Sequence, residues 1–148
     1  MRFFLIVMML LMRTAGAIAR DEAGNLSMPD AQVRAVLKTQ FDRPDSPLHV
    51  AAVAAHGGHS LASWRQDKRG GRALLRKNAG QWQVVLCGGA ELKNIIALEK
   101  AGVPSGSALI ISKKLSKLES RLDVNQRLQF DSFQPGRAAH DSHDAHHH

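Results

Sequence analysis

Residues 48–87 carry the feature that most limits what this chain can fold into, a two-residue period interrupted by glycine-rich turns. Such alternation is typical of strands, and paired glycines can adopt the positive φ angles that a two-residue hairpin loop requires. The stretch "LHVAAVAAHGGHSLASW" therefore predicts a hairpin that turns at Gly57 and Gly58, with Trp64 on the opposite sheet face from the histidines. Its register pairs His56 with His59, Ala54 with Leu61, Val53 with Ala62, and Ala51 with Trp64.

A second hairpin is predicted in "GGRALLRKNAGQWQVVLCGG", with its turn near residues 78–80. If Asn78 lies opposite Gln81, the two strands share a coherent apolar face. A slip of one residue would move each side chain to the other face and abolish this register. The register pairs Leu75 with Val84, Ala73 with Leu86, and Arg72 with Cys87.

Helical periodicity flanks the two hairpins. "SMPDAQVRAVLKTQF" predicts a helix from about Pro29 to Phe41, which "DRPDSP" ends. "AELKNIIALEKAGVP" and "PSGSALIISKKLSKLESRL" predict two further helices, and "RLQFDSF" predicts a short last strand. The second of these two helices has an apolar stripe at spacings of three and four, formed by Ala108, Ile111, Leu115, Leu118 and Leu122.

Together these elements predict an α+β fold for residues 20–133. It consists of a four-stranded antiparallel sheet of two hairpins plus a short C-terminal strand, packed against an N-terminal helix and two C-terminal helices. The two C-terminal helices are expected to cover one face of the sheet, and the length suits a single domain with one core. The expected core residues are Val33, Leu37, Trp64, Leu75, Val84, Leu86, Ile95, Leu115 and Leu118.

Residues 1–19, "MRFFLIVMMLLMRTAGAIA", have the pattern of a signal peptide. Arg2 precedes an apolar run of about ten residues, and small residues before Arg20 form a cleavage site. The run is short of the roughly twenty residues that span a bilayer, so we do not expect a membrane anchor. The mature protein should therefore be periplasmic, and its formal charge falls from +7 to +5 because two arginines leave with the leader.

Residues 134–148 are predicted to form a disordered tail rich in histidine and aspartate. Imidazoles and carboxylates in such a segment bind Cu(II), Ni(II) or Zn(II) loosely. The alternative is an engineered affinity tag. Five of the eight histidines of the chain lie here, namely His140, His143, His146, His147 and His148.

Three further side chains are candidate metal ligands. His56 and His59 would face each other across a two-residue turn, where Cβ atoms are about 4.5–5.5 Å apart. A third ligand, His49 or a tail histidine, would have to complete such a site, and the alternative is an exposed polar tip. Cys87, the single cysteine, would be a Cu(I) ligand if it is exposed, with Arg72 as a neighbour that lowers its pKa. The alternative is a small buried residue.

The stretch from Arg65 to Lys77 is strongly basic, with Asp67 as its only acidic residue. It could bind an acidic partner or an anionic membrane surface, or simply be a solvated face. Export argues against nucleic acid as a partner, and no aromatic residues interleave the charges. Its basic residues are Arg65, Lys68, Arg69, Arg72, Arg76 and Lys77.

Catalytic motifs are missing from the sequence. It contains no paired carboxylates, no nucleophile elbow, no phosphate-binding loop and no HExxH zinc motif. We therefore expect no enzymatic activity.

An ordered set of short motifs resembles a known family. "FDRPDSPLHV", "GGRALLRK", "WQVVLCGG", "AGVP" and "FDSF" follow one another behind the leader, within roughly Asp30 to Phe133. In this order they are similar to the copper uptake system-associated proteins, which are small bacterial periplasmic proteins. The resemblance implies a periplasmic, non-enzymatic accessory role connected with copper, and it supplies no assigned ligand set.

Two functions are therefore predicted. The first is an accessory protein of copper uptake or homeostasis, which binds copper ions transiently or docks to copper-handling envelope proteins. The alternative is an envelope protein-interaction module that binds no metal and uses the basic surface from Arg65 to Lys77. The first makes the histidines and Cys87 the site, and the second makes the lysines and arginines the site.

Overall fold

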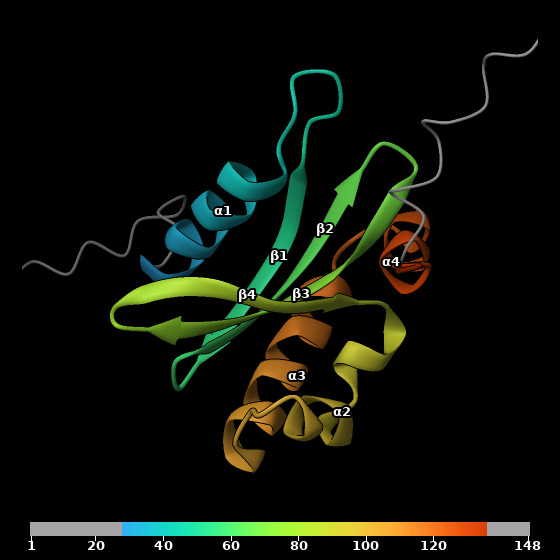
Figure 1. The fold of residues 1–148 in the computed structure, drawn as a ribbon. Helices are drawn as coiled ribbons and strands as arrows, with labels where there is room; N and C mark the ends of the chain where they lie inside the picture. The colour runs from blue at the N-terminus through green and yellow to red at the C-terminus, as the bar shows by residue number, and fades with distance from the viewer. Residues whose placement is uncertain (1–27, 136–148) are drawn as a thin grey trace, which may run out of the picture.

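The structure is a computed structural model that describes residues 28–135 (Figure 1). The predicted signal peptide and all but the first two residues of the predicted tail lie outside this range. The element order is α1 (Met28–Phe41), β1 (His49–His56), β2 (His59–Gln66), β3 (Arg69–Asn78), β4 (Gln81–Gly88), the 3-10 turn η1 (Ala90–Lys93), α2 (Ile95–Lys100), α3 (Ser105–Glu119) and α4 (Val124–Asp131).

The four strands form one antiparallel sheet in the order β1-β2-β3-β4. This sheet and the helices around it confirm the predicted α+β class. The predicted turn between β1 and β2 is also confirmed, since Gly57 and Gly58 have φ values of 58° and 75°. Asn78 pairs with Gln81 across the second predicted turn. Each connection between consecutive strands is a two-residue loop.

Two bulges change the predicted register. Ala51 is an extra residue on β1, so that Trp64 pairs with Val50 and the predicted pairing of Ala51 with Trp64 is wrong. Between the bulge and the turn the predicted pairs of β1 and β2 are confirmed. A bulge adds one residue to one strand and bends the backbone there. Because the extra residue is itself apolar, the apolar run of the sequence shows no interruption.

The second bulge lies on β4 at Val85. Leu75 pairs with Val84 as predicted, but beyond the bulge Cys87 pairs with Ala73 and Gly88 pairs with Arg72. The predicted pairings of Ala73 with Leu86 and of Arg72 with Cys87 are therefore wrong. The one extra residue places Cys87 and Arg72 on opposite faces of the sheet.

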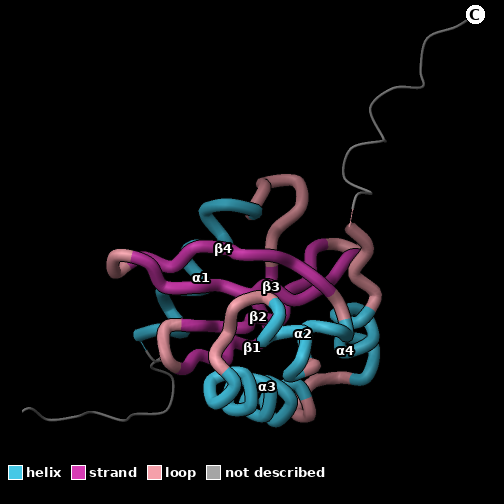
Figure 2. The backbone as a smooth tube through the Cα atoms, turned by 60° about the horizontal axis from the view of Figure 1, so that its bottom comes forward, coloured by secondary structure: helices cyan, strands magenta, loops and turns pink. Residues whose placement is uncertain are grey.

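Helices cover both faces of the sheet, and Figure 2 shows α2 and α3 together on one side of the strands. α2 and α3 share one face, as predicted for the two C-terminal helices, but the prediction of a single core is wrong. β2 and β3 direct apolar side chains to both faces, as Leu74 and Leu75 illustrate. The α1-side core contains Val33, Leu37, Leu48, Val53, Ala62, Ala73, Leu75 and Trp82. The α3-side core contains Ala52, Ala54, Leu61, Leu74, Leu92, Leu98, Val103, Ala108, Ile111 and Leu115.

The C-terminal segment is a helix and not the predicted strand. Asp123 caps α4 by accepting a hydrogen bond from the Asn125 backbone N–H at 2.7 Å. Phe130 is fully buried while Leu128 is 59% exposed, so the two side chains do not share a face as strand alternation would require. α4 lies close to β3 at Gly70, where a Cβ atom would come 2.7 Å from the Gln129 carbonyl oxygen.

The helix predicted after β4 is divided. Asn94 separates η1 from α2 and caps α2, because its side chain accepts hydrogen bonds from the backbone N–H groups of Ile96 and Ala97. Ile96 is 61% exposed and does not join the core with Leu92. The long α3 helix follows the prediction as far as Glu119, with Ala108, Ile111 and Leu115 buried. Leu118 is half-buried, and Leu122, the last residue of the predicted stripe, lies beyond the end of the helix.

Candidate functional site

The tip of the β1–β2 hairpin brings two histidines together, because His56 and His59 are directly paired as predicted. His56 Nδ1 lies 3.2 Å from Ser107 Oγ on α3, and His59 Nδ1 lies 3.3 Å from the Gly57 carbonyl oxygen. A carbonyl oxygen only accepts, so a neutral His59 ring donates from Nδ1 and keeps its lone pair on Nε2. This is the hydrogen-bonding arrangement that prepares an imidazole to ligate a metal ion.

The described residues do not complete the pair. Nowhere in residues 28–135 do three His, Cys, Asp or Glu side chains lie close enough to hold a metal ion. His49 begins β1 and pairs with Arg65, seven residues from the tip, which is roughly 23 Å at about 3.3 Å per residue. His49 is therefore not a third ligand, and the five tail histidines, His140 to His148, lie outside the described residues.

Cys87 lies in different surroundings from those the sequence predicts. It packs against the α1-side core, whereas Arg72 points to the α3 side. Burial raises the pKa of the Cys87 thiol above its usual value, so the predicted lowering by Arg72 is wrong. The thiol is neutral near pH 7, and a neutral thiol is a weaker ligand and nucleophile than a thiolate.

Arg72 is the centre of a buried ionic cluster on the α3 side of the sheet. Its Nε and Nη2 donate to the two carboxylate oxygens of Glu119 at 2.8 and 2.9 Å. Its Nη1 donates to Asp131 Oδ1 at 2.7 Å and to the Gly89 carbonyl oxygen at 2.9 Å. The guanidinium also lies 5.9 Å from the centroid of the Phe130 ring.

The carboxylate of Glu119 has further partners. Ser63 Oγ donates to it, and Lys93 Nζ lies 3.3 Å from Oε2. Burial alone would raise the pKa of Glu119, but the hydrogen bonds from Arg72 and Ser63 and the two nearby positive charges lower it below its usual value. Burial likewise opposes the charge on Arg72, and its bonds to both carboxylates outweigh burial and raise its pKa.

This cluster joins β3, α3 and α4 and leaves little capacity for a ligand. The Arg72 side chain and the Glu119 side chain are 0% and 2% exposed, and their strong donors and acceptors are bound within the protein. Sequence reasoning missed Glu119, although a signal was present. Glu119 lies four residues after Leu115 on the apolar stripe of α3, where a carboxylate needs a buried partner.

The predicted basic surface is not one surface. Arg72 is fully buried, so its assignment to a partner-binding face is wrong. Lys68 and Arg69 lie at the β2–β3 turn, while Arg76 and Lys77 lie near the other end of β3, and all four are exposed. Arg65, the sixth basic residue of the stretch, is half-buried on β2.

No protein family, no curated protein sequence and no solved structure matches this chain. The resemblance to the copper uptake system-associated proteins therefore stays a prediction from short motifs. None of the helices within residues 28–135 combines the length and the apolar character needed to cross a membrane.

Proposed function

We propose that this protein is a periplasmic accessory protein of copper uptake or homeostasis, and that it holds a copper ion transiently at the tip of the β1–β2 hairpin. The pairing of His56 with His59 carries the proposal, because each ring has its Nδ1 near a hydrogen-bond partner. When both rings donate from Nδ1, with Ser107 Oγ accepting from His56, two Nε2 lone pairs are available on neighbouring strands, and imidazole is a good ligand for Cu(II).

The surroundings of the tip favour weak binding and easy release. Two protein ligands are fewer than a stable copper site uses. Arg76 pairs with His59 across β2 and β3, so that a positive charge lies beside the ion. Both features suit a protein that passes copper on, and a tail histidine is the remaining source of a third ligand within the chain.

Calorimetric titration of Cu(II) into the mature chain, residues 20–148, tests this function. The matched set contains the mature chain, a form that ends at residue 139, and the His56→Ala/His59→Ala variant of each. We expect the truncated form to keep one weak site, and the double substitution to abolish it. His49→Ala in the truncated form is the control and should leave that site unchanged.

Two results would contradict the assignment of copper to the tip. One is unchanged binding by the truncated form after His56 and His59 are replaced. The other is binding that disappears entirely with residues 140–148, which would move copper handling to the tail. Absence of binding by every form would contradict the copper function itself.

A second candidate function is docking to an acidic envelope protein without metal. The observation that favours it is the presence of two exposed basic pairs, Lys68 with Arg69 and Arg76 with Lys77, at opposite ends of the β3 region. Replacing each pair in turn by glutamate, and measuring retention on immobilised polyglutamate against salt concentration, would show which pair binds. Retention that neither replacement lowers would contradict this candidate.

A further inference from the structure

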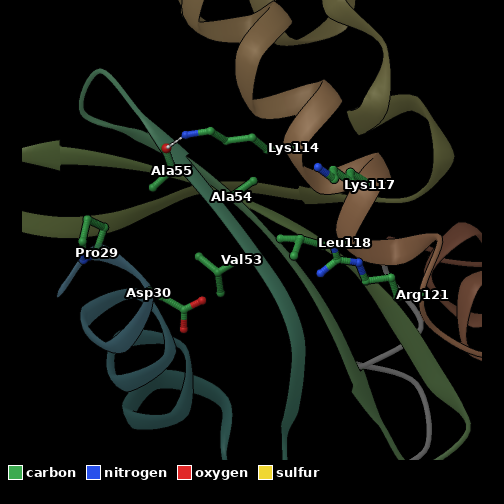
Figure 3. A pocket seen from close by; sticks show the side chains of 9 residues that line it. All are labelled: Pro29, Asp30, Val53, Ala54, Ala55, Lys114, Lys117, Leu118 and Arg121. Atoms are coloured by element: carbon green, nitrogen blue, oxygen red, sulfur yellow. Dashed lines mark hydrogen bonds between the residues drawn. The ribbon is translucent and has the colours of Figure 1, made fainter. Parts of the chain in front are cut away.

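A groove of about 390 Å³ lies between α1, β1 and α3, and neither the tip histidines nor the two basic pairs line it (Figure 3). Val53, Ala54 and Ala55 of β1 form its floor, Pro29 and Asp30 come from α1, and Lys114, Lys117, Leu118 and Arg121 come from α3. The small side chains of β1 allow another backbone to approach closely.

β1 is the first strand in the sheet order, so one of its edges has no neighbouring strand within residues 28–135. In an antiparallel ladder, alternate residues direct their N–H and C=O groups to the open edge. Ala55 is one of them, since its carbonyl oxygen accepts from Lys114 Nζ at 3.4 Å. By the same alternation Val53 directs its N–H and C=O outward, and no side chain within residues 28–135 hydrogen-bonds to them.

The α3 wall of the groove is positively charged. Lys114, Lys117 and Arg121 follow one another at spacings of three and four and are all exposed. Within the described residues Lys117 and Arg121 form no ion pair. Asp30, the one carboxylate among the described residues that line the groove, is already paired with Arg34 of its own helix.

The two walls of the groove differ in polarity, and this difference determines which side chains of a bound strand each wall would accept. Along β1, Val53 packs with the α1-side core and Ala54 packs with the α3-side core. Residues of a strand added beside β1 would alternate in the same way. Every second side chain would face the cations of α3, and the others would face the apolar surface at Val53 and Pro29.

We propose that the open edge of β1 binds an extended segment of a partner protein, in which acidic and apolar residues alternate, as a fifth strand of the sheet. Backbone hydrogen bonds to the edge provide binding energy, and the α3 cations select acidic side chains. Lys114 also protects the edge when it is free, because lysines along a sheet edge discourage pairing between copies of the chain.

A labelled seven-residue peptide of alternating Glu and Val, titrated with the mature chain and followed by fluorescence anisotropy, tests the proposal. We expect binding that the Lys117→Glu/Arg121→Glu variant weakens by at least about tenfold. Lys113→Glu is the matched control, because Lys113 is exposed on the same helix and does not line the groove. It should change the affinity less than about twofold.

Two N-methylated peptides separate strand addition from charge attraction. Methylation of the Glu amides in one peptide and of the Val amides in the other removes alternate N–H donors. Only one set faces β1 in an added strand, so one peptide should lose binding and the other should keep it. The His56→Ala/His59→Ala variant should bind the parent peptide normally, which separates this site from the copper site.

Three results would overturn the proposal. The first is equal weakening by Lys113→Glu and by the double variant, and the second is indifference to both methylation patterns. The third is binding that appears only after residues 20–27 are deleted, which would assign the groove to this chain's own acidic segment. Circular dichroism of each variant verifies that it remains folded.

Discussion

Two polar clusters lie on the same face of β2, one around Ser63 and one at His59, and α3 contacts both. Near its C-terminal end, Glu119 of α3 meets Ser63 and Arg72 in a buried network. At its N-terminal end, Ser107 contacts His56 at the exposed tip. The first cluster uses its polar groups within the protein, whereas in the second no hydrogen bond from residues 28–135 reaches Nε2 of either ring. The difference separates a structural ionic cluster from a candidate ligand site.

The largest expected effect comes from breaking the buried cluster. Arg72→Met leaves the Glu119 carboxylate buried without its main partner, which should destabilise the fold by about 3–5 kcal/mol. Urea unfolding measures this change. The double variant Arg72→Met/Glu119→Leu should recover much of the loss, because it removes both charges. A loss below about 1 kcal/mol in the single variant would show that the cluster is not structural.

The second prediction concerns pH. The pKa of Glu119 is lower in the folded than in the unfolded state, so its contribution to stability is present above the unfolded value. That contribution should be lost as the pH falls through the folded value, below the normal range of glutamate. Urea midpoints measured from pH 7 to pH 3 should fall more for the parent chain than for Glu119→Gln. Parallel curves would contradict this.

A smaller effect is expected where α3 reaches the tip. Ser107→Ala removes the partner of His56 Nδ1, and one hydrogen bond of about 1 kcal/mol corresponds to roughly a fivefold change in affinity. Cu(II) binding by the form ending at residue 139 should weaken by about that factor, while its stability stays nearly unchanged. Ser116→Ala, on the exposed side of α3, is the control. Equal affinity in both variants would leave Ser107 without a role in orienting His56.

Replacing Arg76 should change the Cu(II) affinity in the opposite direction. Arg76→Gln removes the positive charge that is paired with His59, so Cu(II) should bind roughly threefold more tightly at low salt. The gain should shrink as salt screens the charge. Lys68→Gln, at the far turn, should produce no such gain. A gain in Cu(II) affinity in Arg76→Gln that does not depend on the salt concentration would indicate changed packing and not a charge effect.

The smallest expected effect is at Cys87. Because burial raises the pKa of this thiol, its alkylation by iodoacetamide near pH 7 should be slower than that of a free cysteine, and the rate should increase as the pH rises. Cys87→Ala should leave Cu(II) affinity at the tip unchanged. Rapid labelling at neutral pH would contradict the burial of the thiol.

The parts of the fold that sequence predicts well are those that local chemistry determines. Gly57 and Gly58 define the first hairpin, and the apolar stripe defines α3. The bulges at Ala51 and Val85 were missed because an extra residue in an apolar run leaves no visible break in the pattern. The strand predicted at the C-terminus is a helix because the cap at Asp123 and the burial of Phe130 outweigh the short alternation.

The candidate site likewise has one part that the sequence predicts and another that it does not. The facing of His56 and His59 follows from the length of the turn alone, and it is confirmed. The burial of Arg72 could not be separated from the exposure of Arg69 or Arg76, because all three are cations in one basic strand. What distinguishes Arg72 is a carboxylate far along the chain, and only the three-dimensional fold brings Glu119 to it.

The strand order also bears on how fast the chain assembles. Every strand pairs with its immediate neighbours along the sequence, so the sheet forms by closing short loops, which costs little chain entropy and favours rapid folding. The docking of α3 joins residues that are far apart in sequence, since Glu119 lies 47 positions from Arg72. We therefore expect the meander to form early, and α3 and α4 to pack on it afterwards through buried apolar side chains and the hydrogen bonds of Arg72.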